Sequence, residues 1–252
     1  VEAVLAFYAE AVERFDKITH SEERLAELTA QRAEIVGKLY KLCLAVSDLR
    51  KKCAARLASD VMKELTDLGM KNTKFVVEFV ECPTIETFAK SPSVASFDKV
   101  RFLMSANPGE PLKPLAKVIS GGEMSRFMLA VKNITARAEH IPTMVFDEID
   151  TGISGKMAQM VANKLANVAA DKNFGYQCIV ITHLPQIAAM ADANMVISKV
   201  VENDRTHTVV SRTTGAERVQ EVARLMGGSG AASVAAAKEL VAECDAYKRK
   251  IK

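Results

Sequence analysis

With 252 residues, 49% of them hydrophobic and 6% aromatic, the chain is long enough for one or two domains with a sizeable core. That balance favours helices and buried parallel strands over an aromatic-rich β-sandwich, and a net charge of +3 is too small to indicate nucleic-acid binding by itself. Five scattered cysteines indicate neither a zinc site nor a disulfide framework; without a signal peptide or an apolar run of membrane-spanning length, the sequence predicts a cytoplasmic protein with no membrane partner.

Residues 1–69 are predicted to form a helical coiled-coil stem segment, because they contain no proline and carry apolar residues in alternating steps of three and four. The one charged residue in this seam, Arg32, can lie along it and send its charge out to water. The seam comprises Leu25, Leu28, Arg32, Ile35, Leu39, Leu42, Val46, Leu49 and Cys53. Residues 20–23 predict a break in the helix, with Ser21 as the N-cap of the following segment.

A seam of this length needs a partner helix, and no later segment of the chain is long enough to supply one. We therefore expect the partner outside this sequence or on another chain; the alternative is an ordinary long helix packed on a globular domain. The chain begins at Val1 inside a helical pattern, and we expect it to be a piece of a longer protein. Basic clusters at residues 50–52 and 248–250 are either nucleic-acid contacts or, more simply, a solvated helix face and a frayed terminus.

Residues 70–252 are predicted to form a second domain, an α/β lobe. Buried strands that alternate with helices indicate a mainly parallel sheet. Two β-like segments, 74–82 and 99–105, come first, and a turn-rich loop follows at 106–111. The later strands are predicted at 143–146, 177–182, 194–201 and 207–212, and the helices at 121–138, 154–170, 185–191, 216–226 and 231–247.

The helix at residues 121–138 opens with an unusual sequence, Ser120-Gly121-Gly122-Glu123. As a capping box, Ser120 would cap the helix and Glu123 would reach back to it. That interpretation does not explain two glycines in the first turn, where they weaken a helix. Glycines there leave the free N–H groups open to an anion, so a phosphate site is the competing interpretation.

Two acids, Asp147 and Glu148, directly follow the predicted strand 143–146. A strand ending in this way delivers both carboxylates to the carboxyl edge of a parallel sheet, where ligands collect. Asp147 would hold Mg²⁺ and Glu148 would act as general base on an attacking water. The alternative for such a pair is a solvated turn.

A single histidine, His183, follows the next buried strand, 177–182, and is expected at the same edge as Glu148. There its ring can bind a γ-phosphate and hold the attacking water in line. Alone, a histidine at a strand end is more often a surface residue. The order of glycine-opened helix, acidic strand end and histidine strand end favours catalysis.

These motifs together resemble the C-terminal lobe of an ABC/SMC-type P-loop ATPase head, preceded by a coiled-coil stem. In such heads the Ser-Gly-Gly-Glu segment is the signature motif, the acidic strand is Walker B and His183 is the switch histidine. The stretches Phe146–Gly155, Ile181–Ala189 and Glu217–Gly228 are further similar to the RecN family of SMC-like DNA repair ATPases. Transporter ATPases carry an Asp six residues after the catalytic Glu, where this chain has Ser154; Asp150 stands two residues after Glu148 instead.

The resemblance implies an ATPase that uses ATP and Mg²⁺ in the repair of DNA double-strand breaks. The implied nucleotide contacts are Ser120, Gly121, Gly122, Glu123 and Asp150, with Asp147 as metal ligand and Glu148 and His183 as catalytic residues. No G-x-x-x-x-G-K-[ST] loop occurs in the sequence, and Gly227–Gly230 is predicted to be a linker between two helices.

The partners implied are the N-terminal half of the same head with its Walker A loop, a second head that joins in an ATP-dependent dimer, and DNA of the nucleoid. The signature motif would act on nucleotide held by the second head, while Glu148 and His183 act on their own. Two alternatives stay open: an SMC-like ATPase of chromosome organisation, and a non-catalytic coiled-coil interaction module.

Overall fold

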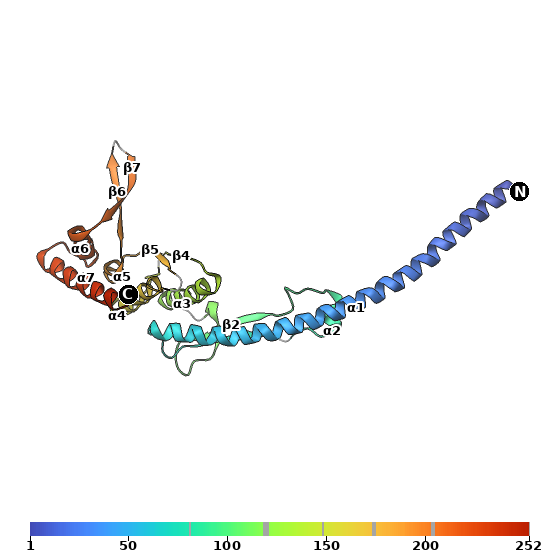
Figure 1. Ribbon diagram of the computed structural model, residues 1–252, viewed down its shortest axis with the longest axis horizontal. Helices are drawn as coiled ribbons and strands as arrows, with labels where there is room; N and C mark the ends of the chain where they lie inside the picture. Colours follow the sequence, from blue (N-terminus) through green and yellow to red (C-terminus); the bar gives the residue numbers. More distant parts are fainter. Residues whose placement is uncertain (81, 118–120, 148, 173–174, 203–204, 252) are drawn as a thin grey trace. The chain divides into compact units, whose positions relative to one another are not determined.

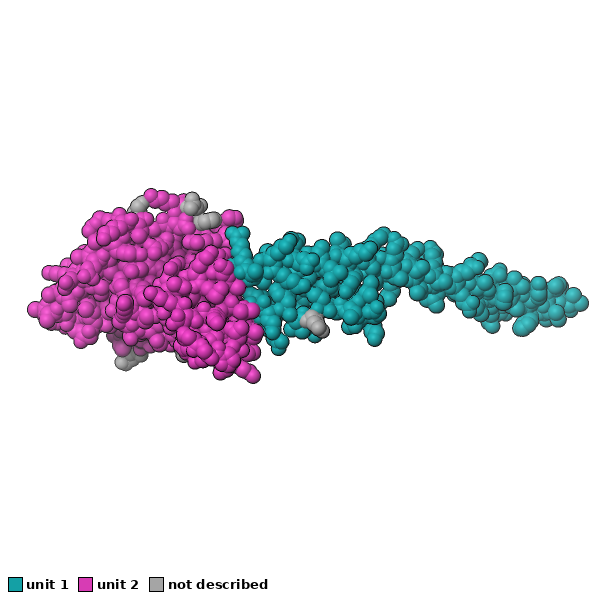
Figure 2. Space-filling view, turned by 90° about the horizontal axis from the view of Figure 1, so that it is seen from below, with its two compact units in different colours: residues 1–56, 77–101 teal, residues 57–76, 102–252 magenta. Residues whose placement is uncertain are grey.

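The computed structural model describes residues 1–252 apart from 81, 118–120, 148, 173–174, 203–204 and 252 (Figure 1). The chain divides into two compact units, coloured separately in Figure 2. Unit 1 comprises residues 1–56 and 77–101, and unit 2 comprises residues 57–76 and 102–252. The division into a stem at 1–69 and a head lobe at 70–252 stays a prediction.

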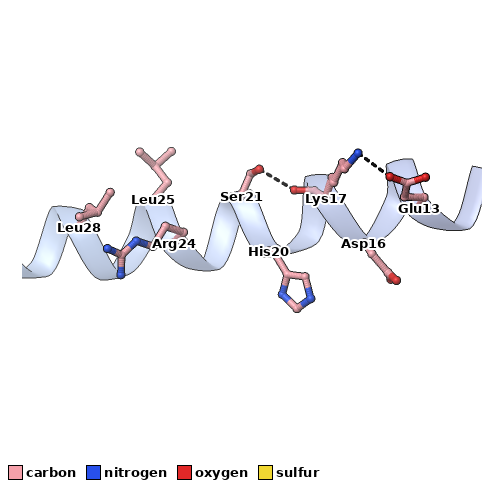
Figure 3. A pocket seen from close by; sticks show the side chains of 8 residues that line it. All are labelled: Glu13, Asp16, Lys17, His20, Ser21, Arg24, Leu25 and Leu28. Carbon is pink, nitrogen blue, oxygen red and sulfur yellow. Dashed lines mark hydrogen bonds and ion pairs between the residues drawn. The ribbon is translucent and has the colours of Figure 1, made fainter.

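Helix α1 (Glu2–Asp67) is continuous, so the predicted break at residues 20–23 is wrong. Ser21 does not cap a new helix; its hydroxyl donates back to the carbonyl oxygen of Lys17 (Figure 3), as a serine within a helix does. The flanking sequence explains the correction, because ion pairs one turn apart, such as Lys17 with Glu13, support a helix through this region. The shallow surface in Figure 3 is lined by this single helix.

The core of unit 1 forms where α2 (Ile85–Lys90) and its flanking residues pack on α1. The aromatic rings of Tyr40, Phe88 and Phe97 lie with centroids 5.5–5.6 Å apart, next to the buried Val36 and Cys43. Such tilted ring pairs add to the stabilisation from burial. The sequence did not predict α2, because six residues are too few to display a helical period.

Polar contacts fix the same segment on α1. Arg32 is exposed, as predicted, and it also donates to the carbonyl oxygen of Ala89 at 2.6 Å. Asp98, with a side chain 2% exposed, accepts from Ser47 at 2.6 Å and from Arg50 at 2.7 Å. Arg50, from the first basic cluster, therefore serves an internal ion pair.

The predicted seam of α1 is mainly exposed to solvent. Its exposed members are Leu25, Leu28, Arg32, Ile35, Leu42, Val46, Leu49 and Cys53, whereas Leu39 packs against the core of unit 1. Within the described parts of the chain, most of the seam thus remains uncovered. A row of exposed leucines is costly in water and fits the expected need for a partner helix.

Unit 2 contains the predicted succession of helices and strands, each within a few residues of its expected ends. The elements are α3 (Gly121–Glu139), β4 (Thr143–Phe146), α4 (Gly155–Ala169), β5 (Gln177–Val180), α5 (Pro185–Met190), β6 (Asn194–Glu202), β7 (Arg205–Thr213), α6 (Gly215–Leu225) and α7 (Ala231–Ile251). The segment at 227–230 lies between α6 and α7, as predicted. Lys248 of the second basic cluster is only 12% exposed and pairs with Asp192 and Asp245.

Strands β4 and β5 pair in parallel, with Thr143 opposite Gln177 and Phe146 opposite Val180. β6 and β7 form an antiparallel hairpin that extends away from α5, α6 and α7 (Figure 1). A further sheet has the order β1-β2-β3, of which β2 and β3 are antiparallel. Its strands are β1 (Lys74–Phe79), β2 (Val100–Ser105) and β3 (Lys113–Pro114), followed by the short 3₁₀ helix η1 (Leu115–Lys117).

The last turns of α1 lie in the core of unit 2, where Val61, Leu65 and, just after the helix, Leu68 are fully buried. Glu64 accepts from Asn133 of α3 at 2.9 Å and pairs with Lys164 of α4 at 2.9 Å. These bonds join the end of α1 directly to the helix that carries the glycine-opened start. Among the described residues, no helix is both long enough and apolar enough to cross a membrane.

Candidate active site

The parallel pairing of β4 and β5 brings the ends of both strands to one edge. Met144 and Phe146 alternate into the core, and the amide of Ile181 donates to the carbonyl oxygen of Phe146 at 2.9 Å. The pair therefore stays aligned just beyond β4, where Asp147 is exposed to solvent. Glu148 lies outside the described residues.

The loop after β4, residues 149–153, is anchored by the burial of Ile149 and Ile153. Between them lies Asp150, which is 2% exposed. One carboxylate oxygen, Oδ2, accepts from Thr182 Oγ1 at 2.5 Å and from the amide of His183 at 2.9 Å, and it lies 3.1 Å from His183 Nδ1. The loop is thereby bound to the end of β5.

The same loop also contacts the start of α3. A Cβ atom added to Gly122 would lie 2.5 Å from the carbonyl oxygen of Gly152, which real Cβ contacts do not reach. Gly152 itself has a φ of 73°, and its own added Cβ would meet the Gly122 nitrogen at 2.9 Å. Close backbone packing thus requires glycine at both positions.

Gly121 differs from its neighbour. It is exposed, and an added Cβ would find only the methyl group of Thr151, at 3.9 Å. The first turn of α3 is therefore open at Gly121 and covered at Gly122. Ser120, the predicted cap, lies outside the described residues, so the competing capping and phosphate interpretations of its hydroxyl both stay predictions.

Beyond the first turn, α3 is held by Arg126, for which no separate role was predicted from the sequence. Its Nε donates to the carbonyl oxygen of Gly122 at 3.0 Å, and Nη1 donates to that of Leu68 at 3.2 Å. Burial lowers the pKa of Arg126, and the charge of Glu123 partly offsets this effect. Glu123, predicted as a nucleotide contact, lies half-buried within the electrostatic reach of this guanidinium.

The structure therefore brings together several of the predicted residues. Gly122 meets the loop after β4 at Gly152, and His183 meets the same loop at Asp150. The sequence missed Thr182, whose hydroxyl binds Asp150. Its position one residue before His183 could have suggested the contact, because both residues follow β5 at the edge shared with Asp147.

Comparisons with known proteins bear on the fold and the family of the chain. No family model matches the chain. The head domain of Smc with a coiled coil and joint from Pyrococcus yayanosii matches 71% of this chain and 30% of its own, with a TM-score of 0.53 and 18% sequence identity. That likeness shows the fold, an SMC-type head lobe preceded by a long helix.

Curated relatives are closer in sequence. The DNA repair protein RecN of Halalkalibacterium halodurans is 37% identical over 228 residues, 90% of this chain and 39% of its own length. RecN of Bacillus subtilis is 37% identical over 259 residues, 98% of this chain and 44% of its own length. The chain spans about two fifths of the length of the curated relatives it matches. With the motifs of an ABC/SMC-type head in the expected order and this similarity along nearly its whole length, the chain belongs to the RecN family.

Proposed function

We propose that this chain supplies the signature motif, the Walker B acids and the switch histidine of an SMC-like ATPase that acts in the repair of DNA double-strand breaks. The observation that carries the proposal is the loop at 149–153. Gly152 contacts Gly122 at the start of α3, and Asp150 binds the end of β5 at His183. One loop of this chain thus contacts both the start of α3 and the end of β5, which supports a single head lobe that carries all three motifs.

The described residues fit a bound nucleotide and its metal ion. Asp147 offers an exposed carboxylate at the end of β4, and Mg²⁺ in nucleotide sites uses one or two carboxylates together with phosphate oxygens. When bound there, Mg²⁺ would neutralise charge on the phosphates. The uncovered Gly121 would let a phosphate oxygen approach the start of α3, and the hydroxyl of Ser120 would add a donor.

Hydrolysis would then need two further residues of this chain. Glu148 would accept a proton from the attacking water while the water oxygen bonds to the γ-phosphorus. The bond from that phosphorus to the oxygen of the ADP leaving group would break. His183, whose side chain is 70% exposed, would bind the γ-phosphate and the water in line. The products are ADP and inorganic phosphate.

The signature motif and the catalytic residues of one chain would act on nucleotides bound by different heads. Ser120, Gly121 and Gly122 would act on nucleotide held by a second head, whereas Glu148 and His183 would act on nucleotide of their own head. ATP bridging two signature motifs would close a head dimer, and hydrolysis would open it. Contacts with DNA would be to its backbone, at the nucleoid in the cytoplasm, and would weaken with salt.

A half-head that carries the Walker A loop is the first partner we propose. Apolar residues on one side of the β4–β5 pair are exposed, with Val145 at 53%, Ile179 at 46% and Ile181 at 51%. Such a face is costly to leave in water and would be covered in a complete head. The exposed seam of α1 would pair with the helix leading from that half. We accordingly propose that the chain alone neither binds ATP tightly nor hydrolyses it.

The test is the ATPase rate of the chain co-expressed with the N-terminal half. Glu148→Gln removes the general base and should lower kcat by about 10²-fold or more. Ser120→Arg places a bulky side chain at the signature motif and should lower it similarly. Glu139→Gln, at the exposed end of α3, is the matched control and should leave the rate unchanged. Turnover that neither Glu148→Gln nor Ser120→Arg affects would contradict the proposal.

A further inference from the structure

We infer that Asp150 is a positioning residue for His183: it holds the imidazole in one tautomer, with Nδ1 bound to the loop and Nε2 directed to the reaction. The inference rests on the proposed function, since it concerns how the switch histidine works. The sequence predicted that Asp150 contacts the nucleotide; we infer instead that it acts through His183.

The burial of Asp150 is the first observation. A carboxylate that is 2% exposed must find donors within the protein, because an unsatisfied buried charge is strongly destabilising. Its Oδ2 atom finds the hydroxyl of Thr182 and the amide of His183, both at the end of β5. This carboxylate therefore binds the end of β5 and does not face solvent.

The ring of His183 is the second observation. Its Nδ1 lies 3.1 Å from the same Oδ2 atom, within hydrogen-bonding distance of a pure acceptor. If Nδ1 donates to this oxygen, it carries a hydrogen whether the ring is neutral or cationic, and this is the tautomer that we infer. The hydrogen bond of one ring nitrogen decides what the other can do.

The exposure of the ring leaves one of its nitrogens accessible to a substrate. The side chain of His183 is 70% exposed although its Nδ1 lies beside Asp150, so Nε2 is the nitrogen left for a substrate. In the neutral ring Nε2 accepts a hydrogen bond from the attacking water, and in the cation it donates to a phosphate oxygen. Without Asp150 the two nitrogens would exchange these roles freely.

Thr182 completes the arrangement. Its hydroxyl donates to Asp150 and accepts from the amide of Leu184 at 3.0 Å. The backbone before and after His183 is thereby bound to the same short network. Because the loop itself is fixed by the burial of Ile149 and Ile153, Asp150 provides a rigid reference point for the ring.

The kinetic test uses the complete head, made from this chain and the N-terminal half. Asp150→Asn should lower kcat about 10- to 100-fold, as loss of a carboxylate behind a functional histidine does, and should leave KM for ATP within about 2-fold. The double variant with His183→Gln should be no slower than His183→Gln alone, because Asp150 acts through that ring. Asp48→Asn, on the exposed surface of α1, is the matched control.

The outcomes separate this inference from the proposed function. If His183→Gln leaves kcat unchanged, the proposed function of the histidine is wrong. If His183→Gln lowers kcat but Asp150→Asn does not, only the role of Asp150 is wrong. Effects of the two changes that simply add would likewise overturn it, because they would show that Asp150 supports the fold independently of the ring.

A spectroscopic test does not depend on turnover. In the complete head with ¹⁵N-labelled histidine, the His183 signal is assigned by its loss in His183→Gln and read at a pH well above the ordinary imidazole pKa of about 6.5. The hydrogen should be on Nδ1 in the wild type and should move largely to Nε2 in Asp150→Ala. A wild-type ring with its hydrogen on Nε2 would overturn the inference, even if Asp150→Ala fails to fold.

Discussion

At the scale of single residues, the two glycines at the start of α3 turn out to differ in their surroundings. From the sequence, both glycines were explained by one hypothesis, the close approach of a phosphate to the start of the helix. The structure shows that Gly122 is already required by its contact with the backbone of Gly152, while Gly121 faces open space. Contacts between residues 30 positions apart cannot be read from local spacing, so this division was not predictable.

The difference between the glycines predicts unequal effects on stability. Gly122→Ala must displace the loop at Gly152 and should lower the free energy of unfolding by about 1–3 kcal/mol. Gly121→Ala meets no close atom and should be neutral or slightly stabilising, because alanine favours a helix. Urea denaturation of both variants checks this. Equal stabilities of the two variants would contradict the described packing.

Cysteine reactivity gives a second prediction at this scale. Burial raises the pKa of the Cys178 thiol on β5 to about 11, so at pH 8 it is almost entirely protonated. Cys53 on α1 is exposed. Iodoacetamide at pH 8 should therefore modify Cys53 well before Cys178, as measured by mass spectrometry of the peptides. Raising the pH toward 11 should accelerate the reaction of Cys178; modification of Cys178 first would contradict the raised pKa of its thiol.

At the scale of elements, periodicity and strand composition predicted nearly the whole of unit 2. They failed where an element is short or where local signals compete. Helix-forming neighbours and ion pairs outweigh the capping preference of Ser21, so α1 is continuous through this residue. The helix α2 has only six residues and owes its place to the aromatic cluster with Tyr40, which is a tertiary contact.

The docking of residues 77–101 on α1 should depend on pH through Asp98. Burial would raise the pKa of its carboxyl, but hydrogen bonds from Ser47 and Arg50 outweigh this and lower it. A pKa that is lower in the folded state stabilises the fold above the unfolded value, about 3.9, and this stability is lost as pH falls toward the folded value.

Replacing the carboxylate should remove that dependence. Asp98→Asn should cost about 1–3 kcal/mol of unfolding free energy at pH 7, through weaker bonds to Ser47 and Arg50. The difference from the wild type should shrink as the pH is lowered below about 4. Urea denaturation across this range, with Asp48→Asn as control, measures it. A difference that grows on acidification would show that the sign is wrong.

The exposed seam gives another prediction about an element. Leu42 is 64% exposed and lies on the seam, whereas its neighbour Lys41 is exposed on another part of the helix surface. Leu42→Asp should prevent co-purification of the N-terminal half and leave the helical content of this chain unchanged, because a charge at the seam disrupts coiled-coil packing. Lys41→Asp should co-purify normally. Equal recovery of the partner with both variants would show that the seam does not pair.

At the scale of the whole molecule, the sequence predicted the class of fold and the family, and the comparisons confirmed both. Which surfaces need partners could be predicted only for α1, because its seam has a recognisable period. The exposed residues on β4 and β5 looked like core positions in the sequence. A strand that is buried only in a complete head has the same composition as one buried within its own chain.

The division of labour between heads can be measured directly by mixing two inactive complete heads, one with Ser120→Arg and one with Glu148→Gln. In a mixed dimer one ATP site would combine an intact Glu148 with an intact signature motif from the other head, and the second site would carry both lesions. Random association of equal amounts should then restore about a quarter of the wild-type rate. If the mixture is no more active than its two components, the signature motif does not act across the dimer, and the composite site proposed for this chain is contradicted.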